Sequence, residues 1–120
     1  GIRVLDGQTL GHIPEQPGLS PLPAIARVLA RQNLRADALS IAEIMEAYAV
    51  QAIACVQGAG LNPEIVNPGG GALARGHPIG ASGAVNVVRL HHELLSRGGT
   101  GLATIAAAGG IGSALILAAR

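Results

Sequence analysis

Apolar and polar positions along the chain follow each other in a way that predicts five strands. Residues 2–5 alternate, residues 39–44 alternate in part, and residues 65–67 form a short apolar run. Two longer apolar runs, residues 101–107 and 113–119, are separated by a glycine-rich stretch. Strands this apolar must be covered on both faces, so the two runs are predicted to form a buried hairpin.

Between the strands, apolar residues recur at helical spacing and predict three helices. The first begins at Ser20, whose hydroxyl we expect to cap it, and runs to about Asn33. The second covers residues 46–56 and the third residues 80–95. Residues 6–18 are polar and rich in Gly and Pro, which predicts a loop. We expect the apolar sides of the second and third helices to consist of Val50, Ile53, Ala54, Ala84, Val87, Val88, Leu94 and Leu95.

The elements follow the order strand, helix, strand, helix, short strand, helix, strand, strand. This order predicts an α/β fold with a mixed five-stranded sheet and helices on both faces. A chain of 120 residues can bury one real core, so residues 1–120 are predicted to form one domain, with an irregular segment over residues 1–17. Because the chain begins with Gly1 rather than Met, we expect it to be part of a longer protein.

Composition narrows the possible functions. The net charge is +1 and the basic residues are scattered, while Phe and Trp are absent, so nucleic-acid binding is not expected. No apolar run is long enough for a membrane span. The single cysteine, Cys55, excludes an internal disulfide, and we expect it to be a buried core thiol in a cytoplasmic protein. His91 and His92 are adjacent without an acidic or thiol partner at ligand spacing, so no metal site is predicted.

The most distinctive stretch is residues 67–82, which holds several glycines and one histidine between Gly76 and Pro78. Pro78 fixes its own φ and restricts His77 to extended geometry, so the imidazole is expected to keep one orientation near a helix start. A glycine-rich turn with a capping histidine is the alternative interpretation. A phosphate loop is disfavoured because no Gly-Lys-Ser/Thr ending is present, and a dinucleotide turn because Ala74 occupies the third glycine position.

Residues 67–83, Asn-Pro-Gly-Gly-Gly-Ala-Leu-Ala-Arg-Gly-His-Pro-Ile-Gly-Ala-Ser-Gly, closely resemble the C-terminal signature of the thiolase family. Three further blocks resemble that family in the same order: residues 18–24, residues 43–49, and residues 101–105 with 109–112. The resemblance implies a thiolase-like C-terminal half, which is one half of a duplicated, layered α/β/α/β/α protein.

The family cleaves 3-ketoacyl-CoA by thiolysis, or runs the reverse Claisen condensation, with a nucleophilic cysteine in its N-terminal half. The resemblance makes His77 the catalytic histidine that activates this cysteine. It places Ala108 where a backbone N–H serves an oxyanion hole, and Tyr48 in the acyl pocket. Two family catalytic positions are substituted: Met45 replaces an asparagine that holds a water, and Ala106 replaces a second cysteine that works as acid and base.

The resemblance also implies acyl-CoA and CoA as substrates without a further cofactor. It implies an N-terminal thiolase half as partner, in the same or another chain, and a homo-oligomer of the full protein. Two hypotheses follow. The first is an acyltransferase with an impaired acid–base set, inactive as the isolated chain. The second is a non-catalytic structural subunit or domain that completes an oligomer.

Overall fold

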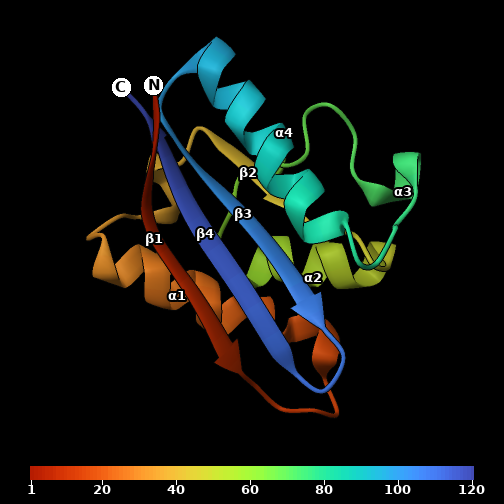
Figure 1. The fold of residues 1–120 in the computed structure, drawn as a ribbon. Helices are drawn as coiled ribbons and strands as arrows, with labels where there is room; N and C mark the ends of the chain where they lie inside the picture. The colour runs from red at the N-terminus through yellow and green to blue at the C-terminus, as the bar shows by residue number, and fades with distance from the viewer.

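In the computed structural model, which describes residues 1–120, four strands form one mixed sheet in the order β1-β4-β3-β2 (Figure 1). The strands are β1 (Ile2–Gly11), β2 (Ile41–Ile44), β3 (Thr100–Ala107) and β4 (Ile111–Ala119). Both β1 and β3 pair with β4 in the antiparallel sense, while β2 pairs with β3 in the parallel sense. The predicted mixed sheet and its C-terminal hairpin are therefore confirmed.

The sheet has four strands where five were predicted. The segment expected to form the remaining strand makes a single parallel bridge, between Val66 and Ala42. A short 3₁₀ helix, Pro63–Ile65, occupies the residues just before this bridge. Asn67 follows it with φ of 45°, a left-handed conformation that ends extended backbone. The chain therefore touches the edge of β2 at one residue and turns away.

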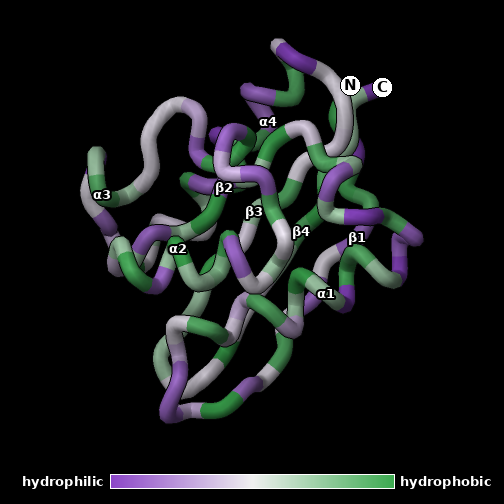
Figure 2. Tube along the Cα trace, turned by 180° about the vertical axis from the view of Figure 1, so that it is seen from behind, coloured by the Kyte–Doolittle hydropathy of each residue, from purple (hydrophilic) through white to green (hydrophobic).

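Helices cover both faces of the sheet, as predicted. The helix α1 (Pro21–Arg31) and the helix α2 (Ala49–Gly58) lie behind the sheet in Figure 1 and in front of it in Figure 2. The helix α4 (Ser82–Arg97) lies on the opposite face, and the short α3 (Ala72–Arg75) precedes it. Two more 3₁₀ turns span Pro17–Leu19 and Ala36–Ala38. None of the helices combines the length and apolar character needed to cross a bilayer.

The N-terminal strand is longer than its sequence pattern predicts. A loop was expected from residue 6, yet β1 continues to Gly11, paired with β4 along its length apart from a bulge between Val4 and Asp6. The pairing explains the difference, because β4 supplies backbone partners to residues with weak strand propensity. Asp6 also forms an ion pair with Arg31 of α1, with 2.9 Å between Oδ2 and Nε.

Ser20 precedes α1 but does not cap it through its side chain, so that prediction was wrong. Its Oγ lies 2.7 Å from the carbonyl oxygens of both Pro17 and Ile111. The hydroxyl therefore joins the start of α1 to the start of β4.

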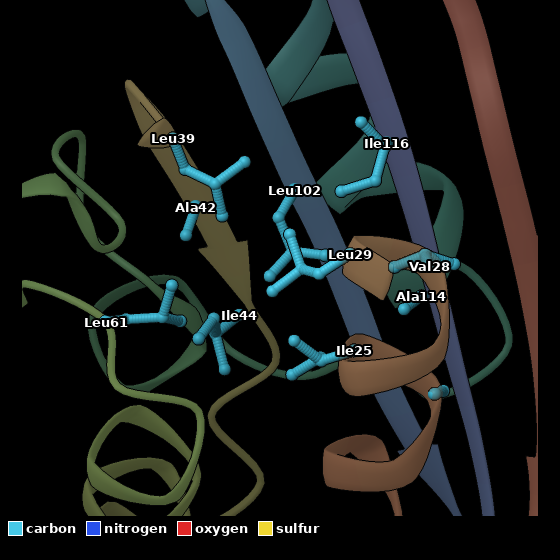
Figure 3. Packing of buried hydrophobic residues seen from close by; sticks show 11 residues of the cluster. Ile25, Val28, Leu29, Leu39, Ala42, Ile44, Leu61, Leu102, Ala114 and Ile116 are labelled. Atoms are coloured by element: carbon cyan, nitrogen blue, oxygen red, sulfur yellow. The ribbon is translucent and has the colours of Figure 1, made fainter. Parts of the chain in front are cut away.

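The main core lies between α1 and the sheet (Figure 3). Ile25, Val28 and Leu29 project from α1 onto the side chains of Leu102 in β3 and Ile116 in β4. A smaller cluster on the other face packs α4 against the sheet and consists of Ile41, Leu90, Leu94, Ala103 and Leu117. The two clusters fix α1 and α4 on opposite sides of the same strands.

The buried sides of α2 and α4 differ from the predicted ones. In α2 the buried residues are Gln51, Ala52 and Cys55, whereas Val50 and Ile53 are exposed. Gln51 is satisfied inside because its amide donates to the Gly18 carbonyl and accepts from the Ala47 N–H. In α4 the buried residues are Ser82, Asn86, Leu90 and Leu94, whereas Val88 and Leu95 are exposed.

Cys55 is a buried free thiol, as predicted. Its Sγ donates to the Gly18 carbonyl oxygen at 3.2 Å. Burial raises the pKa of this thiol, which disfavours the reactive thiolate.

Candidate functional site

The carboxyl ends of β2 and β3 meet the start of α4 at one end of the sheet. Ile44, the last residue of β2, is the register partner of Thr104, which lies in the middle of β3. The Met45 N–H donates to the Thr104 carbonyl oxygen at 3.1 Å, and the Asn86 side chain of α4 donates to the same oxygen at 3.2 Å. Ligand sites in α/β folds form where parallel strands end, which makes this end the candidate site.

The glycine-rich segment predicted from the sequence crosses this end of the sheet, from Asn67 to Ser82. Gly70 and Gly76 adopt φ of 87° and 97°, which favours glycine at both positions. A Cβ atom at Gly71 would collide with the Glu46 carboxylate, so a side chain is excluded there. The Oε1 atom of Glu46 accepts from the Leu73 N–H at 3.2 Å. The segment is therefore held close to the residues that follow β2.

His77 lies at the end of this segment and is partly buried. Its Nδ1 atom lies 2.6 Å from Oγ of Ser82, which is itself buried. The same Oγ donates its proton to the Pro78 carbonyl oxygen at 2.9 Å. Because a hydroxyl has one proton, the bond to the Pro78 carbonyl leads us to assign Oγ as the acceptor of Nδ1–H, which places the lone pair of the ring on Nε2. The ring is thus oriented with Nε2 as its basic nitrogen, which suits proton abstraction.

The two substituted positions, Met45 and Ala106, belong to the same end of the sheet. Met45 follows β2 and is buried, and its thioether cannot donate a hydrogen bond. Ala106 lies near the end of β3, opposite Gly112 of β4, and carries no group that could move a proton. The side chain of Ile105, next to Ala106, faces Gly83 in the first turn of α4. The fold therefore brings these positions close to the element that carries Ser82.

Tyr48 and Ala108 lie in exposed connections at this end of the sheet. Tyr48 is 72% exposed just before α2, so its ring is not enclosed by the residues of this chain. Ala108 lies in the turn between β3 and β4, followed by Gly109 and Gly110 with φ of 89° and 81°. The His12 N–H donates to the Gly110 carbonyl oxygen at 2.6 Å, which ties this turn to the loop after β1.

A buried charge pair lies beside the site and was not singled out from the sequence. Glu43 of β2 is completely buried, and its Oε2 atom lies 3.4 Å from Nε of Arg89 in α4. The other carboxylate oxygen has no hydrogen-bond partner. Burial raises the pKa of Glu43, and the charge of Arg89 opposes that shift in part. A Cβ atom at Gly69 would collide with the Arg89 guanidinium, so this pair also lies against the glycine-rich segment.

Three further residues were missed as parts of the site: Asn67, Ser82 and Asn86. All three are buried polar side chains with hydrogen bonds to residues that lie close to the site. Ser82 could have been found from its position at the start of the predicted helix, five residues after His77. The partners of Asn67 and Asn86 lie 23 and 18 residues away, and no local pattern indicates them.

No group of three or more His, Cys, Asp or Glu side chains is placed to hold a metal ion. A cavity of about 220 Å³ lies between α4, β3 and β4, lined in part by Asn86, Ile105 and Leu115. Neither His77 nor Tyr48 lines it.

Comparison with known proteins gives consistent matches. The family model described as "Thiolase, C-terminal domain" matches residues 2–119. A β-ketoadipyl-CoA thiolase of Pseudomonas aeruginosa is 43% identical over 119 residues, which cover 97% of this chain and 29% of that protein.

Two solved structures share the fold. The Acat5 thiolase of Ascaris suum in complex with coenzyme A superposes with a TM-score of 0.94 at 35% identity, covering 99% of this chain and 31% of that one. The second is the peroxisomal 3-ketoacyl-CoA thiolase of Saccharomyces cerevisiae, described as five layers built from two core domains of identical topology. It superposes with a TM-score of 0.93 at 38% identity, covering 99% of this chain and 34% of that one. The chain thus spans about a third of the length of the proteins it matches.

Proposed function

Because this chain belongs to the thiolase family and matches its C-terminal domain, we propose that the complete protein is an acyl-CoA acyltransferase to which residues 1–120 contribute the catalytic histidine. The orientation of His77 supports this proposal most directly. Ser82 holds its Nδ1–H and leaves Nε2 free for a proton from a nucleophile.

In the proposed reaction the nucleophile is a cysteine in the part of the protein outside this chain. His77 Nε2 takes the thiol proton, and the thiolate attacks the 3-keto carbon of a 3-ketoacyl-CoA. The C2–C3 bond then breaks, leaving an acyl-thioester on the cysteine, and C2 takes up, through water, the proton that His77 removed from the thiol, which releases acetyl-CoA. The thiol of a second CoA gives its proton to His77 and attacks the thioester, the acyl group leaves on that CoA, and the cysteine sulfur takes the proton back from His77. The chemistry needs no cofactor besides the acyl-CoA and CoA substrates.

The substitutions at Met45 and Ala106 predict a slow carbon–carbon step. Methionine cannot replace an oxyanion donor, and removing one such donor costs about 10²–10³ in rate. Alanine cannot protonate C2, and general acid–base catalysis contributes about 10²–10⁴-fold. The Ala108 N–H is retained for a second oxyanion hole, and Tyr48 adds a hydroxyl to the acyl pocket. We therefore propose an enzyme that acylates its cysteine from a simple acyl-CoA, by thioester exchange, more readily than it makes or breaks the carbon–carbon bond.

We also propose that the missing N-terminal half packs on the α4 face of the sheet. The supporting observations are the exposed Val88 and Leu95 on α4 and the open cavity of about 220 Å³ beside it. Opposite it, α1 turns its apolar residues inward. The half that packs there would enclose Tyr48 and bring the cysteine to His77. A homo-oligomer of the complete protein and a cytoplasmic location remain part of the proposal.

The alternative is a non-catalytic thiolase-like domain that completes an oligomer. It is favoured by Met45 and Ala106, since each lacks a functional group that the family's chemistry uses. It is disfavoured by the ordered pair of His77 and Ser82.

The test uses the complete protein and an acyl-CoA labelled in its acyl group. We expect a covalent acyl adduct on a cysteine, detected by mass spectrometry, that is lost in His77→Ala. His12→Ala is the matched control, because His12 lies in the loop after β1, away from α4, and its side chain makes no hydrogen bond; this variant should keep the adduct. Absence of any adduct in the unchanged protein would favour the structural alternative. The isolated 120 residues are expected to show no thiolysis of acetoacetyl-CoA.

A further inference from the structure

Two buried asparagines hold the two ends of the segment that carries His77. Asn67 begins the segment, and Asn86 lies in α4, one turn after its end. Their side-chain amides donate to the carbonyl oxygens of Ile44 and Thr104, respectively. These two carbonyls belong to register partners, Ile44 at the end of β2 and Thr104 in the middle of β3. The segment is therefore attached to the last residue of one strand and to the register partner of that residue in the neighbouring strand.

The Asn67 side chain acts as a strand partner for β2. Its Nδ2 donates to the Ile44 carbonyl oxygen at 2.9 Å, and its Oδ1 accepts from the Ile44 N–H at 2.8 Å. The main-chain N–H of Asn67 donates to the Ala42 carbonyl oxygen at 2.8 Å, next to the single bridge formed by Val66. The carboxamide thus continues the ladder for one more residue after the main chain has turned away.

Few side chains meet both demands at position 67. The backbone has φ of 45°, which glycine, asparagine and aspartate tolerate best. The pairing needs a donor and an acceptor on one short side chain, which glycine lacks. Ionised aspartate offers two acceptors and would face the Ile44 carbonyl without a proton.

The hydrogen bond of Asn86 can be removed without leaving its partner unpaired, so its effect can be measured separately from that of Asn67. It is buried at 3% exposure, and the Thr104 carbonyl oxygen that it bonds at 3.2 Å also accepts from the Met45 N–H at 3.1 Å. Removing the Asn86 amide therefore leaves no unpaired carbonyl on β3. The variant loses the hydrogen bond that connects α4 to β3.

We propose that Asn67 and Asn86 are positioning residues that act as a two-point clamp, fixing the His77 segment across β2 and β3. The clamp holds the His77–Ser82 pair in place from both sides. The inference depends on the proposed function only for what His77 does once it is positioned. Its test reads the conformation of the ring and the segment, so it stands or falls independently of acyl transfer.

The first experiment is Asn67→Asp in the 120-residue chain, with Asn33→Asp as the matched control. Asn33 is the other non-glycine residue with positive φ, at 53°, but it is exposed and its side chain makes no hydrogen bond. At pH 7 we expect Asn67→Asp to speed hydrogen exchange of the Ile44 amide about tenfold after correction for intrinsic rates, because the carboxylate is repelled by the Ile44 carbonyl oxygen and therefore also withdraws from the Ile44 N–H. Protection should return as the introduced carboxyl is protonated, because it then donates to the Ile44 carbonyl oxygen. In the control, the exchange rate of the Ile44 amide should equal that of the unchanged chain both at pH 7 and at low pH.

The second experiment reads the His77 ring by ¹⁵N NMR in Asn86→Leu. The main chain should stay folded, because Thr104 keeps its bond from Met45. We expect the His77 signals to move from a single tautomer toward a mixture, while those of His91 and His92 stay unchanged.

An Asn67→Asp variant that exchanges Ile44 like the Asn33 control would overturn the proposal. So would Asn86→Leu with an unaltered His77 ring. If Asn67→Asp unfolds the whole chain while Asn86→Leu leaves the ring unaltered, Asn67 is a general fold residue and the clamp is rejected.

Discussion

Ser82 determines which nitrogen of His77 is basic, because its single proton is used on the Pro78 carbonyl. We predict that Ser82→Ala turns the His77 ring into a mixture of tautomers in the chain, seen by ¹⁵N NMR. In the complete protein, acyl-adduct formation should slow about tenfold, as expected for one hydrogen bond of about 1.4 kcal/mol. Ser40→Ala, at the exposed residue just before β2, is the control. An unchanged tautomer in Ser82→Ala would remove the basis for Nε2 as the base.

Glu43 makes stability depend on pH in a direction that follows from its burial. Its raised pKa means that the folded chain binds the proton more tightly than the unfolded chain does. This contribution to the free energy of unfolding is complete below the unfolded pKa, near 4.5, and is lost as the pH rises through the folded pKa. Glu43→Gln removes the titration while keeping the shape of the side chain.

We therefore predict that the free energy of unfolding of Glu43→Gln, minus that of the unchanged chain, is larger at pH 8 than at pH 4.5. Urea unfolding at both pH values measures the two differences. Glu15→Gln, in the exposed loop after β1, should give the same difference at both. A Glu43→Gln difference that does not vary with pH would show that the carboxyl titrates alike in both states.

At the scale of elements, the contact between α1 and the β3–β4 hairpin depends on one glycine. A Cβ atom at Gly112 would collide with the Ser20 carbonyl group and the Pro21 nitrogen, both main-chain atoms. We predict that Gly112→Ala destabilises the chain by about 1–3 kcal/mol, because backbone on both sides must shift. Gly80→Ala, where the new methyl group would meet open space, should change the urea midpoint little. Equal midpoints for the two variants would contradict this packing account.

Helix faces show how far local periodicity reaches. In α1 the apolar residues Ile25, Val28 and Leu29 recur at helical spacing, and all three are buried. In α2 the prediction failed, because Gln51 is buried by hydrogen bonds to residues outside the helix, and Val50 and Ile53 are left exposed. Periodicity reports which side of a helix is more apolar. It does not report which side has a neighbour.

At the scale of the whole molecule, α4 and α2, which both carry exposed apolar residues, lie on opposite sides of the sheet (Figure 1). We predict that Val88→Lys leaves the stability of the isolated chain within about 0.5 kcal/mol, since the side chain is exposed. The same change should weaken binding of the chain to the separately produced N-terminal part by about tenfold or more. Val50→Lys, on α2, is the control and should bind normally. Equal weakening by both variants would place the docking surface elsewhere.

Local sequence patterns were enough to predict the α/β class, the order of the three main helices and the four observed strands, the apolar hairpin and the stiff frame around His77. These properties depend on side-chain periodicity and on the φ restrictions of glycine and proline, which act over a few residues. The sequence also fixed that positions 45 and 106 carry no donor or acid, because this depends on residue type alone.

Three features could be read only from the folded structure. The strand β1 continues to Gly11, and the segment beside β2 forms one bridge and no further strand. The buried faces of α2 and α4 are the third feature. The tertiary structure also decided how His77 is oriented and paired Asn67 with Ile44 and Glu43 with Arg89. A buried polar side chain pairs with the hydrogen-bonding group or charge that the folded chain places next to it. That partner can lie dozens of residues away, where no local pattern records it.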